Sequence, residues 1–174
     1  NQSGVSEVSN TAGRVEASCN NASFLIVQVT SNSTSDPVRN IWIGEKAYEG
    51  TSETFHPDFL ANWTNMKVIR FMDWMETNHS EQETWSDRTL PNWYSQGSGH
   101  GICIEYAIEL CNQLQSNAWF CVPHKADDNY IRNFARLVRD NLDPNLKVYL
   151  EYSNELWNWG FSQSQYVLNN ALGH

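Results

Sequence analysis

The sequence predicts an α/β fold in which short strands alternate with helices. Apolar, strand-favouring runs occur at residues 67–72, 117–123 and 148–152, and between them residues 102–114 and 130–142 carry apolar side chains at helical spacing. Polar residues follow each of these strands. In parallel α/β folds the carboxyl ends of the strands border the substrate crevice, so a functional site is expected there.

The first part of the chain predicts a β-hairpin. Residues 1–13 are polar and rich in serine, which predicts an irregular lead-in. Residues 14–19 and 22–30 flank an Asn-Asn pair, and asparagine tolerates the positive φ that a tight turn requires. Residues 31–37 contain several turn-forming residues and predict a linker.

A helix and a strand are expected next, followed by a long polar segment. Pro57 suits the first turn of a helix, and apolar residues recur at helical spacing from Phe55 to Trp63. The strand at 67–72 follows. Residues 76–100 are polar and contain three large aromatic side chains, which predict either a sugar subsite or anchors that hold the segment to the body: Trp85, Trp93 and Tyr94.

The last two helix–strand units end in the most informative residues. Asp127 or Asp128 is expected to cap the helix at 130–142, whose arginines face solvent. The strand at 148–152 stops at Ser153, so Glu155 lies at its carboxyl end. Indole faces beside a carboxylate and an amide suit a sugar ring, whose C–H faces stack on aromatics while its hydroxyls need polar partners.

Three segments carry a resemblance to a known family. The Asn154-Glu155 pair at a strand end resembles the acid/base motif on the fourth strand of retaining (β/α)8-barrel glycoside hydrolases. VIRFMDW at 68–74, WFCVPHKADD at 119–128 and VYLEYSNELWN at 148–158 resemble strands two, three and four of such a barrel, in that order.

The resemblance implies a partial TIM (β/α)8-type barrel of about four βα units in residues 38–174, with 40–44 as its first strand. Residues 1–37 would then be the hairpin and lead-in, or the end of an upstream β-domain. The 174 residues fall short of the roughly 250 of a complete barrel, so the family's seventh-strand nucleophile is not in this chain. The chain is then a fragment, a half-barrel completed by a partner, or a non-catalytic derivative.

The resemblance also implies roles for single residues. Glu155 would be the general acid/base, and Asn154 would bind the 2-hydroxyl of the sugar. Arg70 would hold the carboxylates of the site, or form a structural salt bridge instead. His124 would contact a sugar hydroxyl or a carboxylate, or be structural. The remaining expected substrate-binding residues are Asp73, Trp74, Trp157 and Trp159.

Charge and motif content exclude several classes of partner. A net charge of −9 argues against nucleic acid and anionic membranes, which bind clustered Lys and Arg. The apolar runs are too short to cross a bilayer. No residue spacing supports a metal site and no cofactor is expected. An unrelated α/β-hydrolase is unsupported because there is no G-x-S-x-G motif.

Cysteines and glycosylation motifs favour a secreted, extracellular protein. Cys111–Cys121 together with Cys19–Cys103 is the expected disulfide pairing, and buried reduced thiols are the alternative. The Asn-x-Ser/Thr motif occurs at Asn1, Asn21, Asn32, Asn62 and Asn78.

Two functions remain open at this level. One is a retaining glycoside hydrolase that acts on a polysaccharide. The other is a non-catalytic secreted glycoprotein that binds carbohydrate or assembles, as a homo-oligomer, through exposed sheet edges.

Overall fold

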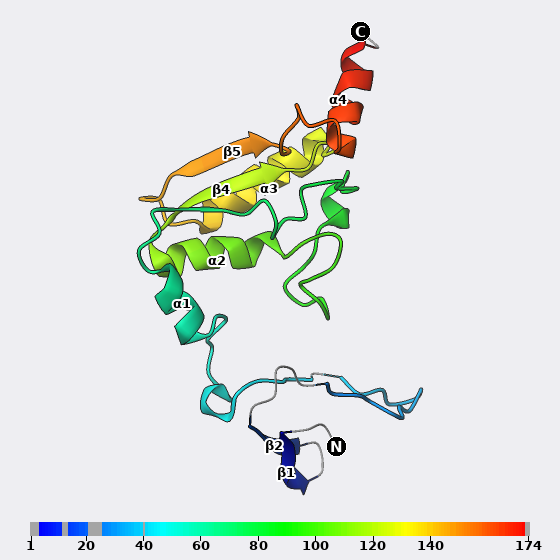
Figure 1. Cartoon of the computed structure of the whole chain (residues 1–174), viewed down its shortest axis with the longest axis vertical. Helices are drawn as coiled ribbons and strands as arrows, with labels where there is room; N and C mark the ends of the chain where they lie inside the picture. Colours follow the sequence, from blue (N-terminus) through cyan, green and yellow to red (C-terminus); the bar gives the residue numbers. More distant parts are fainter. Residues whose placement is uncertain (1–3, 12–13, 21–25, 40, 173–174) are drawn as a thin grey trace. The chain divides into compact units, whose positions relative to one another are not determined.

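The computed structural model describes residues 4–11, 14–20, 26–39 and 41–172. The chain forms two units, Asn1–Gly50 and Thr51–His174. Figure 1 labels their helices and strands. Each unit is described by itself.

The first unit contains one antiparallel hairpin and one helical turn. Strand β1 (Val5–Thr11) pairs with β2 (Arg14–Cys19), with an irregularity between Glu7 and Ser9. A 3-10 turn, η1, spans Lys46–Tyr48. Glu16 accepts hydrogen bonds from Arg14 and Lys46, and Arg14 also pairs with Glu49. None of the described residues of this unit is buried. Its described stabilising contacts are therefore these ion pairs and the backbone hydrogen bonds between β1 and β2.

The hairpin in the first unit pairs different strands from those expected. Residues 14–19 form a strand as predicted, but they pair with the upstream β1 and not with residues 22–30. Residues 26–30 have no regular structure, and 21–25 lie outside the described residues. The prediction was wrong because valines and threonine among the polar residues of β1 suffice for a two-stranded ladder that is exposed to water.

The second unit is built on a three-stranded parallel sheet in the order β3-β4-β5. Its elements are α1 (Pro57–Trp63), β3 (Val68–Arg70), the 3-10 turn η2 (Trp85–Asp87), α2 (Ile104–Leu114), β4 (Asn117–Val122), α3 (Asp128–Asn141), β5 (Val148–Tyr152) and α4 (Ser162–Leu172). The predicted helices and strands of this unit are confirmed within a few residues, whereas α4 was not predicted from its weak apolar pattern.

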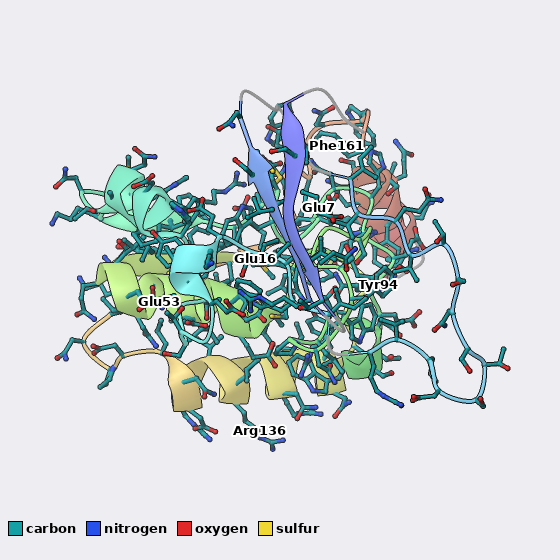
Figure 2. The ribbon with its side chains drawn as sticks, turned by 90° about the horizontal axis from the view of Figure 1, so that it is seen from below. Glu7, Glu16, Glu53, Tyr94, Arg136 and Phe161 are labelled. Carbon is teal, nitrogen blue, oxygen red and sulfur yellow. The ribbon has the colours of Figure 1, made fainter. Side chains whose placement is uncertain are left out.

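Local signals explain where the main helices begin and end. The Asp127 carboxylate accepts a hydrogen bond of 2.6 Å from the Tyr130 N–H, which confirms the predicted cap of α3. Helix α2 ends at Leu114, and the next residue, Gln115, takes a left-handed conformation. Arg136 points away from α3 into solvent, as predicted (Figure 2).

The hydrophobic core lies between one face of the sheet and helices α2 and α3, which run alongside the strands in Figure 1. Phe71 and Phe120 stack with ring centroids 5.5 Å apart, and Phe134 of α3 meets Phe120 edge-on at 5.3 Å. Aromatic pairs of this kind add to the stabilisation from burial.

The opposite face of the sheet is open. Val68, Trp119 and Tyr149 project from neighbouring strands on this face, and each is more than a third exposed. Parallel sheets are ordinarily covered on both faces, so this sheet is incomplete by the usual pattern. None of the helices among the described residues is both long and apolar enough to span a bilayer.

The predicted partial barrel is wrong. β3 and β5 each pair only with β4, and among the described residues no strand continues the sheet beyond either edge. Residues 41–44 of the expected first strand are irregular, and Asn40 lies outside the described residues. A barrel needs strands that pair around a closed ring with a matched stagger, and strand-like sequences alone do not specify that closure.

Candidate functional site

The candidate site lies where β3 and β5 end. Arg70 is the last residue of β3, and Glu151 is the penultimate residue of β5. The Ser153 N–H donates to the Val122 carbonyl at 2.8 Å, which extends the β4–β5 ladder one residue beyond the strand. Asn154 therefore begins the turn that follows β5, at the carboxyl end of the strands.

Arg70 connects the site's polar groups. Its Nε and Nη2 donate to the Glu151 carboxylate at 3.1 and 2.9 Å, and Nη2 also donates to Asn154 Oδ1 at 2.7 Å. The guanidinium lies 5.2 Å from the centre of the Trp119 ring. Arg70 thus forms the salt bridge that the sequence offered as one interpretation and also contacts the amide beside Glu155.

Glu151 has donors on several sides. Besides Arg70, its Oε2 accepts from Trp119 Nε1 at 2.9 Å and from the Cys121 thiol at 3.4 Å. The Glu151 carboxylate thus accepts hydrogen bonds from three side chains, one on β3 and two on β4. Glu151 received no catalytic role from the sequence, which named Arg70 only as the partner that a buried glutamate there would need. The pair forms across β4, which lies between β3 and β5.

The backbone around Asn154-Glu155 is unusual. Ser153 has φ of 58° and Glu155 has φ of 43°, and both are outside the range that L-residues prefer. Two further non-glycine residues with positive φ, Glu76 and His79, lie in the segment after β3. Strained conformations of this kind persist where the surrounding structure holds them and concentrate at functional sites.

Glu155 keeps part of its carboxylate accessible. Its side chain is partly exposed, and Oε2 accepts one hydrogen bond of 3.0 Å from Asn158 Nδ2. The indoles that follow are largely free of packing, because Trp157 is 73% and Trp159 62% exposed. The turn therefore presents a carboxylate and two aromatic side chains to solvent.

Other expected site residues lie elsewhere. Trp74 packs between Phe59 and Phe71, with centroid distances of 6.1 and 5.8 Å, and so belongs to the edge of the core. Asp73 is exposed and takes no part in the hydrogen bonds around Arg70 that the described residues form. His124 is 3% exposed, and its ring meets Tyr166 of α4 edge-on at 5.1 Å.

The long segment after β3 is anchored by one of its aromatic residues. Trp85 meets Tyr130 edge-on at 5.3 Å, and the Arg88 guanidinium lies 4.4 Å from its ring centre. Tyr94 is fully exposed, and Trp93 is partly exposed beside His100. Trp85 therefore fixes the segment to the body, whereas Tyr94 is free to meet a ligand.

The four cysteines are free thiols in this structure, which differs from the expected disulfide pairs. Cys103, Cys111 and Cys121 are buried and Cys19 is exposed. Burial raises the pKa of Cys103 to about 11 and the pKa of Cys111 and Cys121 to about 12. These three thiols stay protonated near neutral pH and are poor nucleophiles.

The glycosylation motifs have different surroundings. Asn32 and Asn62 are exposed, and Asn78 is partly buried with its side-chain oxygen hydrogen-bonded to Asn154 and Gln163. Asn1 and Asn21 lie outside the described residues.

Comparisons leave the family open. The chain matches none of the family models, curated proteins or solved structures with which it was compared. Within the described residues, no group of three or more His, Cys, Asp or Glu side chains is arranged to hold a metal ion. The chemistry at the end of β5 therefore provides the basis for a functional proposal.

Proposed function

We propose that this is a glycoside hydrolase-like protein that acts on a polysaccharide, with Glu155 as general acid/base. The observation that carries the proposal is the turn after β5. It contains the Asn154-Glu155 pair, and Ser153 and Glu155 both have positive φ. Its support from sequence is the resemblance of this motif to retaining glycoside hydrolases.

In the proposed reaction, Glu155 donates its proton to the glycosidic oxygen as the bond from that oxygen to the anomeric carbon breaks. Asn154 binds a hydroxyl of the same sugar, and Trp157 and Trp159 offer faces on which sugar rings stack. A second carboxylate must attack the anomeric carbon or activate a water, and we assign that role to no residue of this chain. In such enzymes it stands about 5–5.5 Å away for retention or about 6.5–9.5 Å away for inversion.

The test compares the native protein with Glu155→Gln on a panel of β-linked polysaccharides, with the release of reducing ends as the readout. We expect the substitution to abolish hydrolysis, because the amide has no proton of suitable acidity to donate. Its thermal unfolding should match that of the native protein, because a glutamine oxygen can still accept from Asn158. Glu53→Gln, at an exposed glutamate, is the matched control and should keep full activity. Full activity in Glu155→Gln would remove Glu155 from the mechanism.

The second candidate is a non-catalytic carbohydrate-binding protein. The exposure of Trp157 and Trp159 favours it, because stacking on indoles requires no carboxylate. We expect β-linked oligosaccharides to shift the tryptophan fluorescence of the native protein and of Glu155→Gln equally if this alternative holds. Binding without hydrolysis by the native protein would decide for this second function.

A further inference from the structure

The side chain of Asn154 is oriented from two sides. Its Oδ1 accepts from Arg70 Nη2 at 2.7 Å, and its Nδ2 donates to Asn78 Oδ1 at 2.9 Å. A guanidinium has only donors, so the amide oxygen of Asn154 must face Arg70 and the amide nitrogen must face the other way. The side chain is only 4% exposed, so these contacts form with little competition from water.

Gln163 supports the same arrangement from α4. Its Nε2 donates to Asn78 Oδ1 at 2.8 Å and to the Asn154 carbonyl at 3.0 Å, while its Oε1 accepts from the His79 N–H at 3.0 Å. Gln163 is completely buried. It therefore ties the segment after β3 to the turn after β5, and it holds both Asn78 and the Asn154 backbone.

The contacts leave hydrogen-bonding capacity on Asn154. A primary amide has two N–H donors and two acceptor lone pairs, and the contacts to Asn78 and Arg70 use one of each. One donor and one acceptor remain beyond these two contacts, in an orientation that Arg70 and Asn78 set.

We propose that Asn78 and Gln163 are positioning residues for the candidate sugar site and act through Asn154. They hold the Asn154 amide in the one orientation in which it is ready to bind a hydroxyl beside Glu155. The sugar as ligand rests on the function proposed above, whereas the control of the Asn154 orientation does not. Neither residue was identified from sequence, where Asn78 stood out only as a glycosylation motif.

Substitutions at Asn78 separate its role in orienting Asn154 from a general contribution to folding. Asn78→Asp keeps an acceptor oxygen for Asn154 and Gln163, and it replaces an amide nitrogen that donates to the Met72 sulfur at 3.6 Å. Asn78→Ala removes the acceptor. Asn78→Ser is the substitute if the alanine variant does not fold, because its hydroxyl is too short to reach Asn154. Asn170→Ala, at an exposed position of α4, is the control.

The first readout is the pair of side-chain amide signals of Asn154 in 15N–1H NMR spectra. In Asn78→Ala we expect the two proton shifts to converge and hydrogen exchange to accelerate by about two- to tenfold, because one hydrogen bond is lost. Asn78→Asp and Asn170→Ala should keep the native signals. Unchanged Asn154 signals in folded Asn78→Ala would overturn the positioning role, whatever the protein binds.

The second readout is the affinity for β-linked oligosaccharides, followed by tryptophan fluorescence. Asn78→Ala should weaken binding by about two- to tenfold, the range of one neutral hydrogen bond, and Asn78→Asp should restore it. Equal affinities in the native protein and Asn78→Ala would overturn the link to the sugar site. If the native protein binds none of these glycans while the NMR signals respond as expected, the proposed function fails and the control of Asn154 stands.

Discussion

At the scale of single residues, His124 is a candidate site residue that the fold buries. The sequence left it as a contact of a sugar hydroxyl or a carboxylate, or as a structural residue, and its ring is buried against Tyr166. Neither ring nitrogen has a hydrogen-bond partner among the described residues. Burial, followed by the nearby charge of Lys125, lowers the pKa of His124, while Glu81 opposes this shift. The neutral ring is therefore the form that the fold accommodates.

This burial predicts a pH-dependent loss of stability. Because the pKa of His124 is lower in the folded than in the unfolded protein, its contribution is fully present above pH about 6.5, the unfolded value, and declines as the pH falls towards the folded pKa. We expect His124→Phe to lose less stability than the native protein between pH 7.5 and 5, by up to about 1.4 kcal/mol per pH unit. Urea unfolding at each pH measures this. Parallel pH profiles for the two proteins would show that His124 titrates normally.

At the scale of elements, the connection from β3 to α2 depends on a close approach of two backbone segments. Gly101 has φ of 71°, and a Cβ built there would lie 2.4 Å from the Trp74 carbonyl oxygen. The Ile102 N–H donates to this same carbonyl at 2.8 Å. Only glycine fits both the conformation and the contact, and the contact helps place the start of α2 against the core.

Gly101→Ala is therefore expected to destabilise the protein by at least about 2 kcal/mol, from the strained conformation together with the clash against a backbone atom. Thermal and urea unfolding provide the measurement. Gly99→Ala, two residues earlier, is the control, because its added methyl group meets no atom within 4 Å. Similar unfolding free energies for the two variants would contradict the close approach.

At the scale of the whole molecule, the described residues bury apolar side chains in the second unit and not in the first. Every buried hydrophobic residue among the described ones lies between Ile69 and Leu142. The first unit exposes apolar side chains such as Val27 and Trp42, each by more than half. Burial is the main stabilising contribution to folding, so unfolding of the described chain should report chiefly on the second unit.

Paired truncations test this distribution. Phe120→Ala should destabilise the protein by about 3–5 kcal/mol, because it opens a cavity among Phe71, Phe134 and the sheet. Val27→Ala, at an exposed position, should change stability by no more than about 0.5 kcal/mol. The unfolding free energy from urea titration is the measurement. A large loss in Val27→Ala would mean that the first unit has a core of its own.

Some residues of the candidate site could be predicted from the sequence, and others could not. Arg70, Asn154 and Glu155 were found because charged and amide residues after strand-like runs are visible as a pattern. Asn78 was missed because it lies 76 residues from Asn154 in the sequence and joins it through the fold. Gln163 was missed because it belongs to α4, the helix that was not predicted. Trp74 was assigned to the mouth of the sheet, whereas contacts with Phe59 and Phe71 place it at the core.

The sequence by itself determined the α-helices and strands of the second unit other than α4, the cap of α3 and the strand-end position of Glu155. These features follow from periodicity and from contacts between residues that are close in the chain. Tertiary structure decided that the sheet stays open at three strands, that β2 pairs with β1, and that His124 is buried. The open sheet and the buried His124 depend on which distant segments meet, and the β1–β2 pairing depends on which of two neighbouring segments pairs with β2. That balance of burial and pairing is not visible in local patterns.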